Sequence, residues 1–354
     1  MLAELVQHVI GVDPDRDWIT AAVVDARTTG VLAKQKFSAD SAGYDDAISW
    51  AEEFTAAGER AWAVEGTASY GRGLTAALAR AGEWVIEFDR PREKGSKDGA
   101  KSDELDAVRA AREALGRDRI HQPRAHDGHR EALRVHTVTR SGVVRARTAA
   151  INELKALVLT APDDLRQELR HLTTRSLVKR CASFRDAPSR PIAERCARNT
   201  MRLIARRIIC FNDEVAVHDI AMKQLVDEAA PQLVAEPGIG HVTAAMFYIA
   251  WSHPGRCRNE AAFARLGGAA PLPATSGQSQ DRHRLNRSGD RQLNTALFTV
   301  ALSRSRIHQP TRDYRDRRRS EGKTDREIRR CVKRYIARRV WRLLEHPPVL
   351  EIAT

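Results

Sequence analysis

Residues 6–39 read VQHVIGVDPDRDWITAAVVDARTTGVLAKQKFSA, and this stretch decides the fold of the first part of the chain. An apolar run that ends at Asp13 is followed by two more apolar runs, Trp18–Ala26 and Val31–Ala39. The turn-like segment Thr28-Thr29-Gly30 separates the last two runs. Short apolar runs between turn residues predict a meander of three β-strands.

Beyond this meander, helical and strand periods alternate. Ser41 is a good N-cap for a helix through Phe54, and Arg60–Glu65 is the next strand. A helix that carries Leu74 and a strand over Trp84–Phe88 follow. Three strands followed by helix, strand, helix and strand predict a ribonuclease-H-like α/β domain. A Rossmann domain also alternates, but no GxGxxG follows the first strand, which argues against a dinucleotide site.

The rest of the chain has a mostly helical pattern. Helical spacing covers residues 102–115, 130–161, 165–179 and 192–233, and prolines follow at Pro231 and Pro237. We therefore expect an α/β domain over residues 1–118 and a helical or coiled-coil connector over residues 119–230. A second, mostly helical domain is expected over residues 231–354.

Four acidic residues occupy positions typical of a metal site. Asp13 ends the first predicted strand, Glu65 ends the fourth, and Asp103 and Asp106 lie three apart on one helical face. The first and fourth strands of a ribonuclease-H-like sheet are neighbours, so the carboxylates are expected to converge at one edge. Carboxylates of this kind clamp two divalent ions ~4 Å apart, and they favour Mg²⁺ or Mn²⁺. The alternative is that all four are solvated acids at element ends.

Charge is distributed unevenly along the chain. The formal net charge is +13, but residues 1–100 hold 11 Lys and Arg against 17 Asp and Glu, whereas residues 255–354 hold 23 against 10. The run over residues 312–342 is rich in arginine and includes Tyr314, Tyr335 and Trp341. A basic helix with interleaved aromatic residues predicts contact with a nucleic-acid backbone, and an ordinary solvated surface helix is the alternative.

Membrane and secretory signals are absent from the pattern. The longest nearly uninterrupted apolar stretch, Val242–Trp251, is far shorter than the ~20 residues that a membrane span needs. Five scattered cysteines form no CxxC pair, which is typical of a reducing compartment. We therefore expect a cytoplasmic protein without a membrane partner.

Three segments resemble the DEDD signature of the transposases of the IS one-ten family of bacterial insertion sequences. They are Ile10–Asp13 (IGVD), Val64–Gly71 (VEGTASYG) and Lys101–Ala107 (KSDELDA). The resemblance extends from about Val9 to Arg304. It implies a RuvC-like N-terminal domain, related to Holliday-junction resolvases, and a C-terminal transposase domain.

The second half of the chain also resembles this family. Glu236–Gly240 (EPGIG) is similar to the hairpin that opens the second domain. The segments FARLGGAAP, PATSG and NRSGDRQLN resemble the Gly-Leu-x-Pro, Ser-Gly and Gly-Asn-x-x-Leu-Arg elements in the family's order. Two positions depart from the pattern, because Asp290 stands where Asn is usual and Asn294 where Arg is expected.

In this family the serine before glycine forms a covalent link to DNA, and the resemblance assigns that role to Ser276. Gly277 removes side-chain bulk beside the hydroxyl, which lets the loop approach a phosphodiester closely. Ser279 is the nearby competitor, and an ordinary Ser/Gly/Gln loop is the alternative for the whole segment.

The resemblance implies a DNA transposase or recombinase with a covalent phosphoserine intermediate. It further implies donor and target DNA, a non-coding bridge RNA that selects both by base pairing, and a homo-oligomer, either dimer or tetramer, at the bacterial nucleoid. The first alternative is a DEDD nuclease or Holliday-junction resolvase that acts through metal-activated water and needs no Ser276. The second is a non-catalytic nucleic-acid-binding protein.

Overall fold

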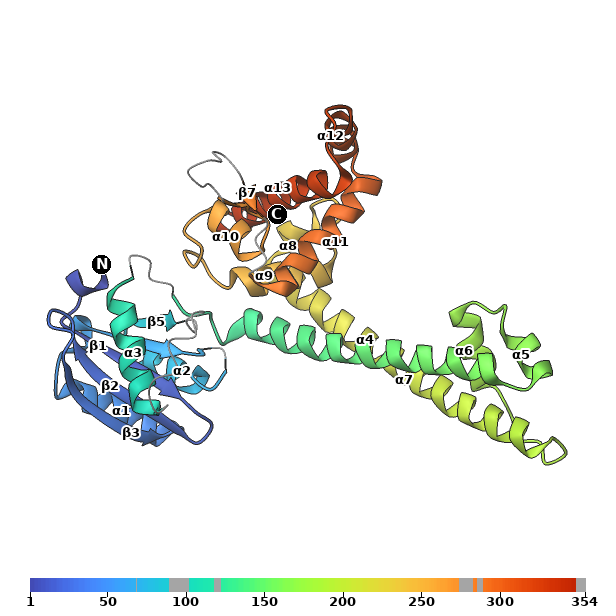
Figure 1. Ribbon diagram of the computed structural model, residues 1–354, viewed down its shortest axis with the longest axis horizontal. Coiled ribbons are helices and arrows are strands. Elements are labelled where there is room, and N and C mark those ends of the chain that lie inside the picture. The colour runs from blue at the N-terminus through green and yellow to red at the C-terminus, as the bar shows by residue number, and fades with distance from the viewer. Residues whose placement is uncertain (68, 89–101, 118–121, 274–282, 285–288, 348–354) are drawn as a thin grey trace, which may run out of the picture. The chain divides into compact units, whose positions relative to one another are not determined.

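The computed structural model describes residues 1–67, 69–88, 102–117, 122–273, 283–284 and 289–347 (Figure 1). The chain forms two compact units. Unit 1 consists of Met1–Gly128 together with Ser252–Arg258, and unit 2 consists of His129–Trp251 together with Asn259–Thr354. Ser276 lies outside the described residues.

Unit 1 is built on a five-stranded sheet with the order β3-β2-β1-β4-β5. Its elements are β1 (His8–Pro14), β2 (Trp18–Asp25), β3 (Val31–Ser38), α1 (Ser41–Glu52), β4 (Arg60–Glu65), α2 (Arg72–Arg80), β5 (Val85–Phe88) and α3 (Asp103–Leu115), with the short 3₁₀ helices η1 (Leu2–Glu4) and η2 (Ala57–Glu59). The first three strands form an antiparallel meander, and β4 and β5 are parallel to β1. The ribonuclease-H-like α/β class predicted from the sequence is confirmed.

The two faces of this sheet have different coverings, as Figure 1 shows. Ile10 and Trp62 face the helices α1 and α2, in a core with Leu74 and Leu78. Side chains alternate along a strand, so Val9, Ala61 and Ala63 point to the other face, where α3 packs with Ala111 and Ala114. The N-cap of α1 is Asp40, one residue before the predicted Ser41, because the Asp40 side chain accepts the Gly43 N–H at 2.9 Å.

Unit 2 is helical, apart from the short antiparallel pair β6 (Leu272–Pro273) and β7 (His283–Arg284). Its helices are α4 (Gly128–Thr160), α5 (Asp163–Leu169), α6 (Thr174–Ala182), α7 (Ile192–Ala229), α8 (Pro231–Val234), α9 (His241–Trp251), α10 (Glu260–Leu266), α11 (Arg291–Ile307), α12 (Gln309–Ser320) and α13 (Asp325–Glu345). The helical class predicted for this part of the chain is confirmed.

The long helices α4 and α7 run antiparallel to each other. His136 contacts His218 at 2.9 Å, and Arg147 donates to Asn212 at 3.1 Å, so residue numbers rise on α4 as they fall on α7. The single helices predicted over residues 165–179 and 192–233 are each divided in two. The second division falls at Pro231, whose ring blocks continuation of the preceding helix.

Candidate active site

The close contact between α3 and β1 places the predicted acidic residues. A Cβ atom on Gly11 would lie 1.9 Å from the Ala107 carbonyl oxygen and 2.9 Å from the Ala111 Cβ, so the helix rests directly on the backbone of this glycine. Sequence reasoning did not single out Gly11. The signal for it was present, because Ala107 and Ala111 form a small-residue pair one turn apart on α3.

Asp13 and Glu65 lie at the same edge of the sheet. The strands β1 and β4 are parallel neighbours, and both carboxylates follow directly after the last residue pair between these two strands, Val12 with Val64. By alternation, Asp13 shares the face of Gly11, and Glu65 shares the face of Ala63. That is the face covered by α3. Both side chains are half-buried.

Asp103 and Asp106 lie in the first turn of α3, which Ser102 caps by accepting the Leu105 N–H. The C-terminal part of α3 packs near the start of β1, and Ala107 lies against Gly11, so the first turn faces the end of β1 that carries Asp13. Asp103 is exposed and Asp106 half-buried. The four acids therefore come from three elements that meet at one edge of unit 1.

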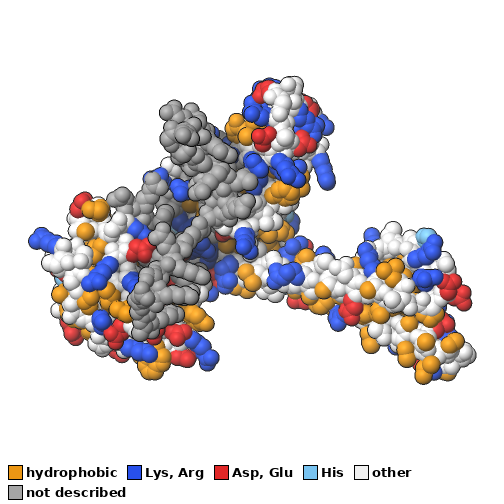
Figure 2. Space-filling model, viewed as in Figure 1, with side chains coloured by type: hydrophobic (Ala, Val, Ile, Leu, Met, Phe, Trp, Pro, Cys, Tyr) orange, Lys and Arg blue, Asp and Glu red, His pale blue; other side chains and the backbone are white. Residues whose placement is uncertain are grey.

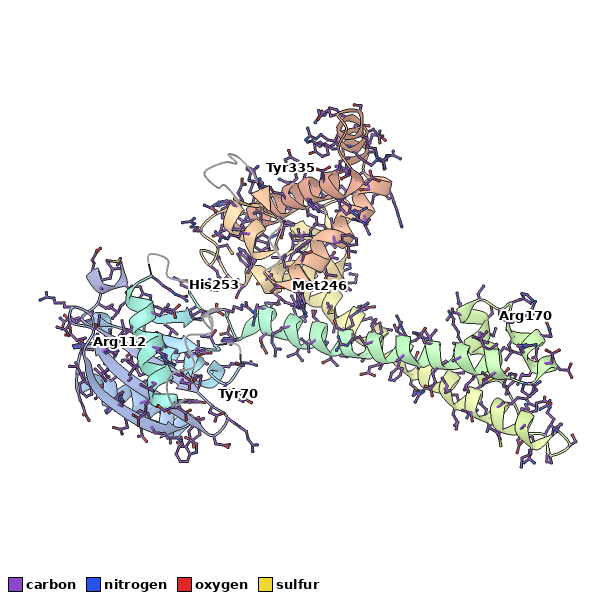
Figure 3. All side chains as sticks on the ribbon, viewed as in Figure 1. Tyr70, Arg112, Arg170, Met246, His253 and Tyr335 are labelled. Atoms are coloured by element: carbon purple, nitrogen blue, oxygen red, sulfur yellow. The ribbon has the colours of Figure 1, made fainter. Side chains whose placement is uncertain are left out.

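Neighbouring charges fix the orientation of α3. Arg109 donates to Asp106 at 3.1 Å, and the Lys34 ammonium on β3 contacts Glu104 at 3.2 Å. Arg112, labelled in Figure 3, donates to the Thr29 carbonyl at 3.1 Å. The Arg109–Asp106 contact lies within α3, and the other two attach α3 to the β2–β3 hairpin.

Oxygen donors of this kind suit Mg²⁺ or Mn²⁺ in their chemistry. Within the described ranges, however, no group of three or more His, Cys, Asp or Glu side chains is close enough to hold a metal ion. Asp106 is directed to Arg109 instead. The acids share an edge of the sheet without forming a ready-made metal cluster.

The segments that flank the predicted serine loop are held together by backbone contacts. The Asp290 N–H donates to the Leu266 carbonyl at 2.8 Å. Gly289 has a φ of 121°, and a Cβ atom there would lie 2.4 Å from the same carbonyl oxygen. Only glycine fits at this close approach. The position occupied by Asp290 serves as the N-cap of α11, accepting the Leu293 N–H at 2.9 Å.

Asn294 connects these segments to α13. Its amide donates to the Gly267 carbonyl at 2.7 Å, and its side-chain oxygen accepts from the Lys333 ammonium at 2.8 Å. Partial burial, together with the nearby charge of Arg330, lowers the pKa of Lys333. The Lys333 ammonium thus lies beside Asn294, the position where the sequence pattern leads us to expect arginine. Sequence reasoning placed Lys333 only in the basic run and missed its contact with Asn294, because the two residues lie 39 positions apart along the chain.

The predicted hairpin at residues 236–240 packs onto α11. Arg304 is almost fully buried and donates to the Pro237 carbonyl at 2.8 Å and to Glu236 at 2.9 Å. Gly238 adopts a φ of 79°, which glycine tolerates best. These contacts fix the turn before α9.

The basic run forms two helices, α12 and α13, with different electrostatic surroundings. On α12 most arginines have acidic partners, as in the pairs Arg315–Asp316 and Arg319–Asp325, and Figure 2 shows red and blue side chains interspersed there. On α13 the exposed arginines Arg326, Arg330 and Arg334 are four residues apart. Within the described part of the chain, none of these three pairs with a carboxylate.

Aromatic side chains lie on the same two helices. The Tyr314 and Tyr335 rings meet edge to face at 5.7 Å, and Tyr335, labelled in Figure 3, is 57% exposed. Burial, with a hydrogen bond involving Cys331, raises the pKa of Tyr314 to about 12. The Tyr314 phenol therefore stays uncharged at neutral pH beside the arginines.

None of the helices in the described ranges combines the length and the apolar character required to cross a membrane.

Comparison with known proteins gives two family matches. A model described as "Transposase", for the DEDD type of IS110 elements, matches residues 10–175, and a model described as "Transposase IS116/IS110/IS902 family" matches residues 231–316. The first match spans the segment that carries the four acids. The second spans the hairpin and the predicted serine loop.

Two relatives support the same assignment. The 42 kDa protein of insertion element IS900 from Mycobacterium paratuberculosis is 25% identical over 91% of this chain and 92% of its own length. The 43.6 kDa protein of insertion element IS110 from Streptomyces coelicolor is 34% identical over 27% of this chain and 24% of its own length.

Proposed function

This chain belongs to the IS110 family of transposases, which makes it a DNA transposase or recombinase, and we propose that Asp13, Glu65, Asp103 and Asp106 act together with Ser276 in strand exchange. The DEDD domain implies dependence on a divalent metal. The substrate is DNA.

The observation that carries this proposal is the shared edge of unit 1. The four acids lie at two strand ends and in the first turn of α3, at one edge of the sheet. The four acids would hold Mg²⁺ or Mn²⁺. A divalent ion bound there supplies charge neutralisation for the phosphodiester and for the attacking and leaving oxygens.

Ser276 serves in the proposal as the nucleophile. Its hydroxyl loses a proton, its oxygen attacks the phosphorus, and the bond from phosphorus to one DNA strand breaks and leaves a free hydroxyl. One phosphodiester is exchanged for another, so its energy is conserved for rejoining. The hydrogen bonds of Asn294 support the assignment. They join Gly267, which precedes the serine segment in the chain, to α11 and to Lys333 on α13.

The remaining parts of the proposal concern partners and location. A non-coding bridge RNA would select donor and target DNA by base pairing, and the protein would work as a dimer or tetramer. Three exposed arginines of α13 support nucleic-acid binding, since Arg326, Arg330 and Arg334 present cations without acidic partners in the described residues. The enzyme would act at the nucleoid in the bacterial cytoplasm, where such DNA lies.

The decisive experiment traps the protein on labelled DNA in the presence of Mg²⁺, denatures it, and maps the modified peptide. We expect the label on Ser276, loss of the adduct in Ser276→Ala, and an unchanged adduct in Ser279→Ala. Efficient cleavage without a protein–DNA adduct would replace this proposal with a nuclease or resolvase that uses activated water.

A further inference from the structure

A cavity of about 730 Å³ lies between α4, α6 and α7 in unit 2, and none of the proposed catalytic residues lines it. Its floor is apolar and includes Ile151, Val178 and Ile208. The last two are buried, and all three belong to the core that joins these helices. The floor is therefore part of a packed structure, and its volume is within the range of small-molecule sites.

The rim of the cavity is cationic. Arg147 on α4 and Arg175 and Lys179 on α6 all line it, and no Asp or Glu is among its lining residues. Arg147 donates to the Asn212 side chain at 3.1 Å. As far as the described residues extend, none of the three forms an ion pair with a carboxylate. This arrangement differs from most of unit 2, where arginines such as Arg180 and Arg207 have acidic partners.

Three like charges around one cavity repel one another, and an anion between them relieves that repulsion. Guanidinium and ammonium groups are the usual partners of phosphate, and hydroxyl side chains on the wall add further donors. The apolar floor suits a ring that is taken out of water. One ligand that combines a phosphate with a flat, poorly hydrated ring is a nucleotide whose base is not paired.

We propose that this cavity binds an unpaired nucleotide of a nucleic-acid strand, with the base on the apolar floor and the phosphate between Arg147, Arg175 and Lys179. The inference rests on the proposed function, because a transposase holds nucleic acid. It adds a contact in the helical connector, far along the chain from the basic helices α12 and α13. A paired base in a duplex does not enter such a cavity.

The test measures binding of full-length protein to single-stranded RNA, single-stranded DNA and duplex DNA of one sequence. The variant Arg175→Ala/Lys179→Ala removes two exposed cations of the rim. The matched control, Lys155→Ala/Arg206→Ala, removes two exposed cations of α4 and α7 that do not line the cavity. The RNA and DNA arms distinguish the source of the nucleotide.

We expect the rim variant to lose about tenfold in affinity for single strands and to keep its affinity for duplex DNA. Its salt dependence should be shallower by about 0.7 in the slope of log K against log salt, which is the value for one single-strand phosphate contact. The control should change neither quantity. In a second variant, Ala182→Leu fills part of the cavity and should weaken single-strand binding without changing the slope.

Equal losses in the rim and control variants would overturn the proposal, because the cavity would then only add to a general positive field. A change in oligomeric state without a change in single-strand affinity would also overturn it, and would identify the cavity as a protein interface. Failure of the unmodified protein to bind any nucleic acid would contradict the proposed function itself.

Discussion

Gly11 is the residue on which the geometry of the candidate site depends most directly. It lets the α3 backbone approach β1, and it brings the first turn of α3 to the edge with Asp13. The helix both covers the sheet and carries two of the four proposed metal ligands. Small residues at such contacts set the distance between elements, and larger side chains change it.

We predict that Gly11→Ala displaces α3. The added Cβ would meet the Ala107 carbonyl oxygen at 1.9 Å, so we expect a loss of about 1–3 kcal/mol in unfolding free energy and a strong loss of DNA cleavage. Thermal unfolding and a cleavage assay measure the two effects. Gly58→Ala is the control, since a Cβ atom there meets nothing within 4 Å. Unchanged stability of Gly11→Ala would contradict the close packing.

The second residue-scale prediction concerns the acids. Replacing Asp13, Glu65, Asp103 or Asp106 by the matching amide should reduce Mg²⁺-dependent cleavage by at least about a hundredfold, because the metal loses a negatively charged ligand. Binding of DNA and thermal unfolding should change little. Glu104→Gln is the matched control on the same turn of α3, where the carboxylate is directed to Lys34. A Glu104 variant as inactive as the Asp103 variant would remove the assignment.

At the scale of elements, the carboxylate of Glu168 links α6 and α7 by accepting hydrogen bonds from one arginine of each helix. Glu168, at the end of α5, accepts from Arg180 on α6 at 2.6 Å and from Arg198 on α7 at 3.1 Å. Arg198 also lies over the Phe184 ring at 4.7 Å. Partial burial raises the pKa of Glu168, but the hydrogen bonds and charges of the two arginines outweigh it and hold the pKa below its usual value.

This lowered pKa predicts a pH dependence. A carboxyl group with a depressed folded-state pKa stabilises the fold above its unfolded value of 4.5, and that contribution is lost as the pH falls through the folded-state pKa. The melting temperature of the unmodified protein should therefore fall more steeply below about pH 4.5 than that of Glu168→Gln. At neutral pH the variant should be the less stable of the two. Parallel curves in acid would contradict the role given to this carboxylate.

At the scale of the whole molecule, the surplus of positive charge is concentrated in the last hundred residues. The share of these cations that pairs with carboxylates differs between helices. The arginines of α12 largely neutralise acids of α12 and of the first turn of α13. On α13, Arg338, Arg339 and Arg342 also pair with acids. The exposed Arg326, Arg330 and Arg334 occupy the side opposite a packed core that includes Val332, Ile336 and Val340. Because α13 carries this core, substitution of its surface arginines is the appropriate test, and deletion of the helix is not.

We predict that Arg326→Ala/Arg330→Ala/Arg334→Ala weakens duplex binding and makes its salt dependence shallower. At ~0.9 for each neutralised phosphate, three lost contacts reduce the slope of log K against log salt by about 2.7. The control is Arg315→Ala/Arg318→Ala/Arg319→Ala on α12, whose guanidiniums already pair with carboxylates, and it should reduce the slope less. Titrations at several salt concentrations measure both. Equal slopes would assign binding to another surface.

The sequence by itself determined the elements of unit 1 and the positions of its acids along them. Period-two runs and turn residues predicted all five strands near their observed bounds, because each strand is buried on a definite face. The positions of Asp13 and Glu65 could be predicted because both residues lie at strand ends. Asp103 and Asp106 could be placed on one helical face because they are three residues apart. The family resemblance to the IS110 transposases was likewise readable from local motifs, and the comparisons confirm it.

Only the tertiary structure decided which distant residues meet. Three features bring together segments that are far apart in the chain. They are the contact of Ala107 with Gly11, the hydrogen bonds that link Lys333 through Asn294 to Gly267, and the lining of the cavity between α4, α6 and α7. Local periodicity does not predict the distances between elements, because it indicates only which face of one element is buried. Long-range packing sets the spacing between elements, and that spacing decides which separate acids and arginines become neighbours.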